Sequence, residues 1–516
     1  MAIAEPHMGS FAGPSGPQSK TVRAAGNLLS AVFLLIAAIN LMGFFSVESA
    51  LQMTHGMAVL FSLYLMGEIW LYLRRSDALG LISPLVLAIL MHFTMSYLVG
   101  ITASYFEPYV LERHGVWLGD LDSHLAKTTA LAMVAAFCLI RGYNFARPFA
   151  NMLRRFLEKT PQLRRDLRSD MGVMVSVQVA YLLLVAYAIN LGVFGLLSTP
   201  ESLARHLSIQ QYLNLALAAG TLSYFLLLLR YYEMREQKRT NSLHAFLILM
   251  LIVVHVTTGA ISAFKSQIIY PFVIAGFAYF LATRRLPYRF IIMGAIALII
   301  AYQVIDPYRS ILKTQSSAPA SAAEAAGLFT HAVANREQYK RVTDLTRTEE
   351  IATRFDLTGM TALAVDFVEG GNVQIQRRYE FQDSILLAPI LAFVPRAIWR
   401  DKPIYSPGIW FNQEVRGQWN DTRTSVAMGA IGYLYITGGF FALVLGFFGF
   451  GMLQSIIFEG FARAGAGGLI VFLSVASTLA LIPTSFGPAI TGVIRMLPVA
   501  FVAQWILLKR APRGAN

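Results

Sequence analysis

Charged residues are scarce in this sequence: Asp, Glu, Lys and Arg make up only 14% of its 516 residues, whereas 56% are hydrophobic and the mean hydropathy is +0.55. A soluble domain carries roughly 25% charged residues, so this chain cannot cover a water-facing surface in the ordinary way. Runs of about 18 or more nearly uncharged residues recur along it, which is typical of membrane-spanning helices. The composition therefore excludes a soluble globular protein and predicts one membrane domain.

Cysteine is almost absent, which excludes an intramolecular disulfide. The single residue, Cys138, lies in the apolar run LAMVAAFCLI and is predicted to be a buried, unreactive thiol. The histidines do not occur at the spacing of metal ligands, so we expect no intrinsic metal site and no cofactor. A Walker loop, a dinucleotide fingerprint, a nucleophile elbow and an HExxH motif are missing too. Without them, ATP-driven transport and classical hydrolase chemistry have no support.

Twelve apolar runs are long enough to span a bilayer, which predicts an all-α polytopic membrane protein of about 12 transmembrane helices. Residues 1–26, rich in Gly, Pro and Ser, are predicted to be a disordered cytoplasmic tail, and residues 509–516 a second tail. Residues 27–305 hold about nine spans and residues 438–508 about three. The spans are placed near residues 27–46, 52–73, 78–101, 125–140, 171–197, 212–231, 243–263, 267–283, 289–305, 438–458, 468–485 and 489–508.

Positive charge gathers in short loops on one side of these spans. The loop 141–170 alone holds eight basic residues against three acidic ones. By the positive-inside rule that side is the cytoplasm, so we expect a multi-pass protein of the bacterial inner (cytoplasmic) membrane with both termini cytoplasmic. Because the net charge of +13 orients the chain in the bilayer, it does not indicate a nucleic-acid partner. The basic clusters lie at residues 20–23, 74–75, 141–168, 230–239, 284–289 and 509–513.

One long segment interrupts the regular alternation. Residues 306–437 are predicted to form a large periplasmic loop containing short helices, because the number of preceding spans places them outside. The loop includes one short apolar run, residues 384–394 (SILLAPILAFV). Eleven residues are too few to span, so a re-entrant or interfacial helix is expected there. The active face of the protein is therefore predicted to be periplasmic.

Fourteen Lys and Arg residues lie in this loop, and two explanations of them stay open. They form either a solvated, salt-bridged surface or an anion site against the outer leaflet, for which the planar guanidinium of arginine is well suited. Charges also occur at the predicted outer ends of helices, where they either reach the headgroups or face a cavity. These helix-end residues are Lys127, Lys265, Asp306 and Arg495.

The most informative local segment is residues 393–403, FVPRAIWRDKP. A short apolar helix ends at a proline, and cations and an indole then follow at the membrane surface. The combination suits a lipid pyrophosphate that carries sugars, with cations for the phosphates and aromatic faces for the sugar rings. The alternative is an aromatic and basic belt that only anchors the loop. The residues concerned are Arg396, Trp399, Arg400 and Lys402, followed by Trp410, Glu414, Arg416 and Trp419.

The run VPRAIWRDKP is similar to the PR-x-x-W-x-x-KP segment of the Wzy-type oligosaccharide repeat-unit polymerases, which build O-antigens, capsules and exopolysaccharides. Residues 424–453, TSVAMGAIGYLYITGGFFALVLGFFGFGML, resemble the small-residue run, aromatic pair and glycine-studded helix of the same family. The resemblance is specific over about 70 residues, from FQDSILLAPI to GFGML, and elsewhere extends only to the topology.

The resemblance implies a metal-independent membrane glycosyltransferase, similar to other enzymes that use polyprenyl phosphates. Such a polymerase moves a growing glycan from undecaprenyl pyrophosphate onto the terminal sugar of an incoming lipid-linked repeat unit. The implied partners are this lipid-linked oligosaccharide and membrane lipids, with a chain-length regulator and a flippase as further partners. The reaction requires that the charge of the leaving pyrophosphate be stabilised and that the acceptor hydroxyl lose a proton.

Arg396 is the first candidate for the pyrophosphate, because Pro395 fixes it at the end of a short helix. The general base stays open among four residues: Asp366, Glu369, Glu414 and His331. The candidates for substrate binding are Arg400, Lys402, Trp399, Arg309, Lys265, Arg495, Arg377, Arg378 and Trp410.

Two other functions fit the same topology. A flippase or transporter of lipid-linked oligosaccharides also has twelve spans and internal termini, but common two-halved transporters have repeats and a central loop, which this sequence lacks. An O-antigen ligase uses the same donor and differs in its acceptor. The motif similarity favours the polymerase over the ligase.

Overall fold

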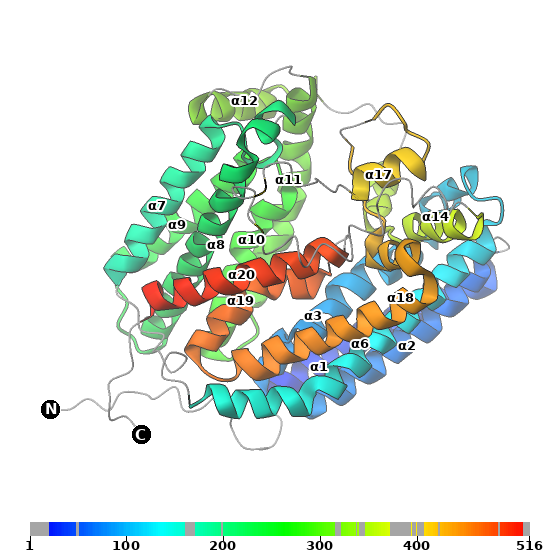
Figure 1. Cartoon of the computed structure of the whole chain (residues 1–516), viewed down its shortest axis with the longest axis horizontal. Helices are drawn as coiled ribbons and strands as arrows, with labels where there is room; N and C mark the ends of the chain where they lie inside the picture. The colour runs from blue at the N-terminus through cyan, green and yellow to red at the C-terminus, as the bar shows by residue number, and fades with distance from the viewer. Residues whose placement is uncertain are drawn as a thin grey trace. The chain divides into compact units, whose positions relative to one another are not determined.

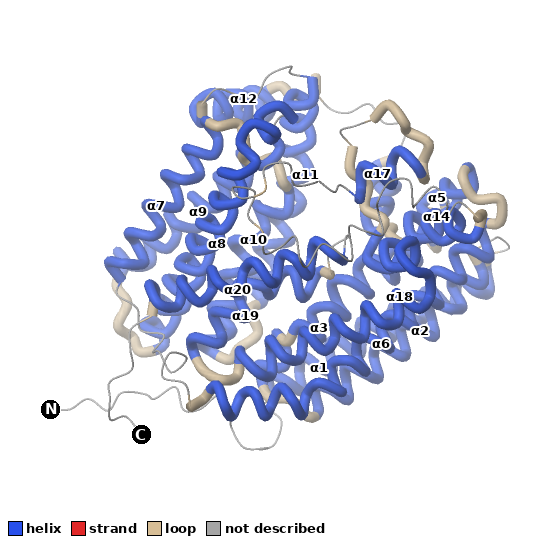
Figure 2. The backbone as a smooth tube through the Cα atoms, in the orientation of Figure 1, coloured by secondary structure: helices blue, strands red, loops and turns tan. Residues whose placement is uncertain are grey.

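The computed structural model describes residues 20–47, 51–159, 171–197, 200–314, 321–336, 338–339, 346–371, 394, 399, 407–421, 424–482 and 486–508. Within these ranges every regular element is a helix and no strand occurs (Figure 2). Among the described residues, nine helices are long and apolar enough to cross a membrane, and the bent pair Tyr288–Ala301 and Gln303–Leu312 makes ten if it counts as one span. The prediction of an all-α membrane protein is confirmed.

Three of the twelve predicted spans are not among those nine helices. The predicted span 212–231 lies within a longer helix, Pro200–Glu236. The predicted span 289–305 is the bent pair. The predicted span 468–485 is the helix Ala466–Leu481, which has 16 residues and at 1.5 Å per residue reaches about 24 Å, less than the roughly 30 Å hydrocarbon core.

Several predicted boundaries also differ from the structure. Helix α1 (Lys20–Ser46) begins before residue 27, so the last residues of the predicted N-terminal tail are helical. Helix α11 (Tyr288–Thr314) continues past residue 305. Helix α18 (Gly429–Ser455) begins inside the predicted loop and breaks at Gly438 and Gly439. In each case the apolar run marks the residues suited to hydrocarbon, whereas the hydrogen-bonded helix extends beyond them. The predicted helix 384–394 lies outside the described residues except for Val394.

The chain divides into two compact units, whose helices can be found by residue number from the colour bar in Figure 1. Unit 1 comprises residues 1–164 and 345–498, and unit 2 comprises residues 165–344 and 499–516. The helices of unit 1 are α1 (Lys20–Ser46), α2 (Gln52–Arg74), η1 (Ala78–Ile82), α3 (Pro84–Ala88), η2 (Ile89–Leu98), α4 (Val99–Ser104), α5 (Tyr109–Glu112), η3 (Arg113–Val116), α6 (Leu121–Leu157), α13 (Arg347–Ala352), η5 (Thr353–Phe355), α14 (Thr358–Glu369), α17 (Pro407–Glu414), α18 (Gly429–Ser455), η6 (Ile456–Ala462), α19 (Ala466–Leu481) and most of α20 (Phe486–Leu507).

Unit 2 is a helical bundle with a buried polar centre. His255 lies between the stacked rings of Tyr181 and Tyr224, with centroid distances of 5.0 and 4.1 Å, and its Nε2 is 2.9 Å from Gln178 Oε1. Gln178 in turn donates to the carbonyl of Gly220, so this buried cluster is satisfied within the unit. The helices are α7 (Met171–Asn190), η4 (Gly195–Leu197), α8 (Pro200–Glu236), α9 (Ser242–Ile261), α10 (Lys265–Thr283), α11 (Tyr288–Thr314) and α12 (Ala322–Ala334).

In unit 1, α6 and α18 lie side by side along most of their length (Figure 1). Two glycines allow this close approach: a Cβ on Gly142 would meet the backbone carbonyl of Phe448, and a Cβ on Gly451 would meet that of Leu139. Small residues at such crossings let the backbones of membrane helices touch. The contact fixes the two ends of α6 relative to the two ends of α18.

Polar side chains concentrate at the two ends of this helix pair. Lys127 and Arg147 are 20 residues apart on α6, which corresponds to about 30 Å at 1.5 Å per residue, the thickness of the hydrocarbon core. Buried Ala135, Ala136 and Leu139 lie between them. We call the region around Lys127 and α14 the α14 end, and the region around Arg147 and η6 the η6 end.

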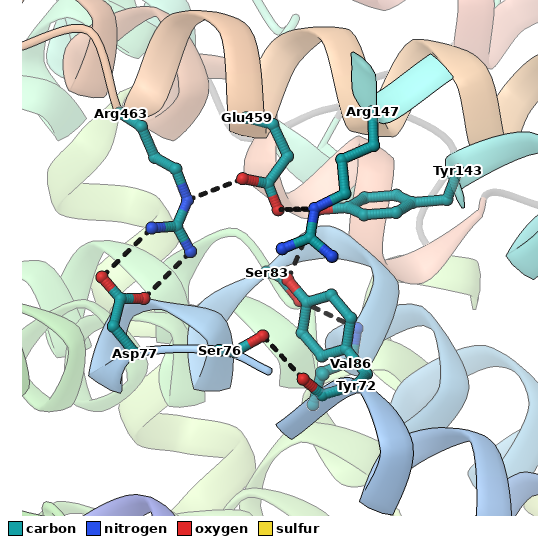
Figure 3. A network of polar contacts seen from close by, with 9 residues as sticks. All are labelled: Tyr72, Ser76, Asp77, Ser83, Val86, Tyr143, Arg147, Glu459 and Arg463. Atoms are coloured by element: carbon teal, nitrogen blue, oxygen red, sulfur yellow. Dashed lines mark hydrogen bonds and ion pairs between the residues drawn. The ribbon is translucent and has the colours of Figure 1, made fainter. Parts of the chain in front are cut away.

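At the η6 end, a network of ion pairs and hydrogen bonds around one buried carboxylate connects the helices (Figure 3). Glu459, 2% exposed, accepts a hydrogen bond from the Tyr143 hydroxyl at 3.0 Å and pairs with Arg463 at 2.8 Å and Arg147 at 3.8 Å. Arg463 also donates to both oxygens of Asp77, at 3.1 and 2.9 Å. Burial alone would lower the pKa of Arg463, but Glu459 and Asp77 outweigh it and raise the pKa. The network thereby ties η6 to α6 and to the start of η1.

Candidate functional site

The α14 end of unit 1 brings titratable side chains together from three helices. Helix α14 packs against both α6 and α18. Asp366 and Glu369 are three residues apart on α14, and His124 and Lys127 are three residues apart on α6, so each pair shares one face of its helix. The two faces meet as two parallel pairs, His124 with Asp366 and Lys127 with Glu369.

Glu369 is the more tightly bound of the two carboxylates. Its Oε1 accepts hydrogen bonds from the Lys127 ammonium and, at 3.0 Å, from the Tyr435 hydroxyl of α18. Partial burial by itself raises the pKa of Glu369, but the bonds from Lys127 and Tyr435 outweigh it and hold the pKa below its usual value. A carboxylate of lowered pKa is a weak proton acceptor, so Glu369 is better suited to orient Lys127 and Tyr435 than to act as a base.

Asp366 is held less tightly, because His124 is its one side-chain partner among the described residues. Its side chain is 42% exposed, and its Oδ1 lies 3.2 Å from Nε2 of His124. The other ring nitrogen of His124, Nδ1, lies 2.6 Å from the backbone carbonyl of Asp120. Each ring nitrogen of His124 thus faces an oxygen, which orients the ring beside Asp366. Asp366 thus has one oxygen beside His124 and a side chain that is partly open to solvent, so it can accept a proton from a hydroxyl.

A fully buried carboxylate fixes the start of α14. Asp356 accepts hydrogen bonds from Nε2 of His114 at 2.6 Å, from Nη2 of Arg113 at 3.2 Å and from the backbone N–H of Gly359 at 2.8 Å. Burial alone would raise the pKa of Asp356, but the bond and attraction of His114, followed by Arg113 and Gly359, lower it. The paired carboxylate therefore anchors α14 to η3 while remaining ionised.

Four of the predicted site residues lie on two neighbouring helices of unit 1. Asp366 and Glu369 end α14, and Trp410 and Glu414 belong to α17. The ring of Trp410 packs edge-on against Phe367 of α14, at a centroid distance of 5.8 Å. The structure therefore brings the predicted aromatic contact to the helix that carries the two predicted acids.

Two more predicted residues of unit 1 are described. Trp399 is 41% exposed, and Arg495 lies on α20. The remaining predicted residues of the FVPRAIWRDKP segment, together with the predicted pair of arginines before it, lie outside the described residues. They are Arg396, Arg400, Lys402, Arg377 and Arg378.

Three predicted residues belong to unit 2. Lys265 forms an ion pair with Asp306 at 2.7 Å and is 10% exposed, so its ammonium is engaged within that unit. Arg309 lies on α11, and His331 lies on α12 with its ring 5.8 Å from that of Tyr339. These residues are therefore separated by unit from the acids of α14.

Sequence reasoning missed the partners of the acids. His124 and Tyr435 were not singled out, and Lys127 was noted only as a charge at a helix end. The matching three-residue spacing of His124/Lys127 and Asp366/Glu369 was the one available signal. Within the described ranges, no three His, Cys, Asp or Glu side chains lie close enough together to hold a metal ion.

A family model described as "Domain of unknown function (DUF8712)" matches residues 168–472, more than half of the 516 residues. The chain belongs to the DUF8712 family. The DUF8712 segment includes Asp366, Glu369 and Tyr435, whereas His124 and Lys127 precede it. No curated protein and no solved structure matches the chain.

Proposed function

We propose that this protein is a polymerase that joins undecaprenyl-pyrophosphate-linked oligosaccharide repeat units at the periplasmic face of the bacterial inner membrane. The observation that carries the proposal is the cluster at the α14 end. It combines two carboxylates with cations and a hydroxyl in a chain that is otherwise poor in charge. Tyr435, which bonds to Glu369, comes from the segment 424–453 that resembles the Wzy-type polymerases.

In the proposed reaction, an acceptor sugar hydroxyl attacks the first sugar of the growing glycan. As the new glycosidic bond forms, Asp366 takes the hydroxyl proton and the bond to the pyrophosphate breaks. Undecaprenyl pyrophosphate leaves with the electron pair of that bond. Arg396, with Arg400 and Lys402, is the proposed stabiliser of its charge, because arginine binds phosphate oxygens in a bidentate manner. Lys127 adds positive potential beside the reacting sugars.

The proposed topology has twelve spans, with the α14 end periplasmic and the η6 end cytoplasmic. It is supported by the loop 141–170, whose basic excess follows the η6 end of α6. The 30 Å separation along α6 supports the same assignment, because each polar end then lies at one membrane surface.

The test is to delete the gene in its host, to resolve surface glycans by length, and to complement with wild type, Asp366→Asn, Arg396→Ala and Glu158→Gln. We expect single repeat units to reach the surface in the deletion strain while long chains disappear. Wild type and the control Glu158→Gln, an exposed change at the far end of α6, should restore long chains. Asp366→Asn should lower chain growth by about 10²- to 10⁴-fold, the usual contribution of a general base.

Each variant must be present in the membrane at the wild-type level for the comparison to count. Loss of single units from the surface would favour the flippase or transporter. Polymers that form but are not transferred to their final acceptor would favour the ligase. Either result contradicts the polymerase.

A further inference from the structure

Two arginines at the α14 end lie in an arrangement that the proposed chemistry does not use. Arg113, in η3, donates through Nη2 to Asp356 at 3.2 Å. Arg416 follows α17, donates through Nη1 to Oδ1 of Asn412 at 3.2 Å, and has its Cζ 5.5 Å from the ring centroid of Trp117. The two guanidinium groups come from segments about 300 residues apart in the sequence, and only the fold brings them together.

The charge around Arg416 is unbalanced. Its described hydrogen bond goes to a neutral amide, whereas the buried carboxylate of Asp356 is bound to Arg113 and His114. Burial first, and then the positive charge of Arg113, lower the pKa of Arg416, and the attraction of Asp421 does not offset them. No ion pair joins the guanidinium group of Arg416 to a carboxylate among the described residues, so its positive charge can be met by a ligand.

Two buried N–H donors of this cluster have no partner among the described residues: Nδ2 of Asn412 and Nε of Arg416. Asn412 is 1% exposed, and its amide is the same group that accepts from Arg416, so its free donor lies beside the guanidinium. A buried donor without an acceptor costs free energy. Because both groups are donors, a ligand that satisfies them must bring acceptor oxygens.

We propose that Arg113, Arg416 and Asn412 bind a singly charged oxyanion on the glycan itself, either the carboxylate of an acidic sugar or a phosphodiester within the repeat unit. The proposal rests on the proposed function, because it makes the substrate of the polymerase an anionic glycan. One surplus positive charge matches a monoanion better than a pyrophosphate. The ring of Trp117, 42% exposed, offers an apolar face to the same sugar.

The position of this site fits the selection of a sugar that is not reacting. Asp356, which holds Arg113, precedes α14, and Asp366 lies ten residues later near the end of the helix. Ten helical residues span about 15 Å, the length of a short oligosaccharide. The anionic sugar therefore binds a few sugar residues away from the bond that is formed. Its binding positions the repeat unit so that the correct hydroxyl lies at the reacting bond.

The test is a binding titration of the purified full chain in lipid nanodiscs, followed by saturation-transfer NMR and without turnover. The probes are cellobiouronic acid, the methyl phosphodiester of cellobiose, neutral cellobiose and inorganic pyrophosphate. We expect wild type and the control Arg239→Gln, an exposed change in unit 2, to bind one of the two monoanionic probes at least tenfold more tightly than cellobiose. The tighter of the two probes identifies the source of the oxyanion.

Two variants separate binding from folding. Arg416→Gln should remove the tenfold preference and leave cellobiose binding unchanged. Asn412→Asp places a carboxylate beside Arg416, so it should remove the preference while the unfolding temperature stays equal or rises. The proposal is overturned if wild type shows no preference, if either folded variant keeps it, or if pyrophosphate binds while both monoanionic probes do not.

The polymer itself provides an independent measurement. If deletion abolishes a polymer whose repeat units are neutral, this inference fails while the polymerase proposal stands. If deletion leaves all surface polymers intact but the binding preference is present and lost in Arg416→Gln, the site stands and the polymerase proposal fails.

Discussion

At the residue scale, the two acids of α14 differ in their surroundings and therefore in the chemistry they can perform. Glu369 is held by Lys127 and Tyr435, which keep its pKa low, whereas Asp366 has one described side-chain partner, His124, at 3.2 Å. Environments that separate two neighbouring carboxylates in this way commonly divide the roles between them. Asp366 is therefore the proposed base and Glu369 the group that positions Lys127 and Tyr435.

This division predicts unequal effects of two matched substitutions. Glu369→Gln keeps an acceptor oxygen for Lys127 and Tyr435, so we expect the rate of chain growth in membranes to fall by less than about tenfold. Asp366→Asn removes the proton acceptor and should cost about 10²- to 10⁴-fold. The measurement is polymer formed per unit time from lipid-linked repeat units. A larger loss in Glu369→Gln than in Asp366→Asn would reverse the assignment.

The buried carboxylate of Asp356 predicts a pH dependence of stability. Because its pKa in the folded protein lies below the ordinary value of 3.8, its contribution is complete above that value and disappears as the pH falls through the lower folded pKa. Asp356→Asn breaks the pairing with His114 and Arg113, which typically costs about 3–5 kcal/mol when a buried pair loses one partner.

Thermal unfolding in detergent measures both effects. At pH 7 the unfolding temperature of Asp356→Asn should lie clearly below that of wild type, and the two should converge as the pH falls below about 3.8. The exposed control Glu236→Gln, at the end of α8, should follow wild type at every pH. Equal stability of Asp356→Asn and wild type at pH 7 would contradict the anchoring role.

At the element scale, the contact between α6 and α18 depends on glycines at two positions. The carbonyl of Leu139 lies where a Cβ of Gly451 would be, and that of Phe448 lies where a Cβ of Gly142 would be. Backbone atoms cannot move aside as a flexible side chain can. The two helices therefore cannot keep this separation with any larger residue at these sites.

Gly449 of α18 provides a matched control, because the space around its Cβ position is open. Gly451→Ala should destabilise unit 1 by about 1–3 kcal/mol through overpacking. Gly449→Ala should be neutral or stabilise by up to about 1 kcal/mol, because alanine is the better helix former. The measurement is the unfolding temperature of the purified protein. Equal shifts for the two substitutions would show that the close contact is absent.

The break within α18 explains why its start was predicted too late. Gly439 has φ +63° and ψ −152°, a conformation that favours glycine, and it separates the segment carrying Tyr435 from the longer apolar part. Hydropathy detects the apolar part after residue 438 but cannot detect the helical turns before it. Those earlier turns are the ones that reach Glu369.

At the scale of the whole molecule, the polar layers at the two ends of α6 predict the orientation in the membrane. Cys138, the single cysteine, is buried, and its replacement by alanine provides a background for single-cysteine labelling. We expect an impermeant maleimide added to spheroplasts to label Val116→Cys, which lies at the α14 end and is 83% exposed. Gln237→Cys, in a basic loop after α8, should react only after the membrane is opened. If intact spheroplasts label Gln237→Cys and not Val116→Cys, the α14 end is cytoplasmic and the proposed topology is wrong.

The general character of the protein could be predicted from sequence because its signals are local. A run of apolar residues determines by itself whether a helix can lie in hydrocarbon, and nine such helices were found where apolar runs predicted them. The residue types of the site were predicted in part by the same kind of local information. Asp366 and Glu369 precede a predicted turn, and Trp410 follows the basic segment.

The partners of those residues could not be predicted in this way, because they are distant in the chain. Lys127 and Glu369 are 242 residues apart, and so are His114 and Asp356. Which carboxylate is buried, paired or open to a substrate depends on how α6, α14 and α18 pack together. Local composition thus predicts an all-α membrane protein and the kinds of charged residue that it carries. Which charges meet depends on the packing of the helices, because the energy of an ion pair depends on distance in space and not on separation along the chain.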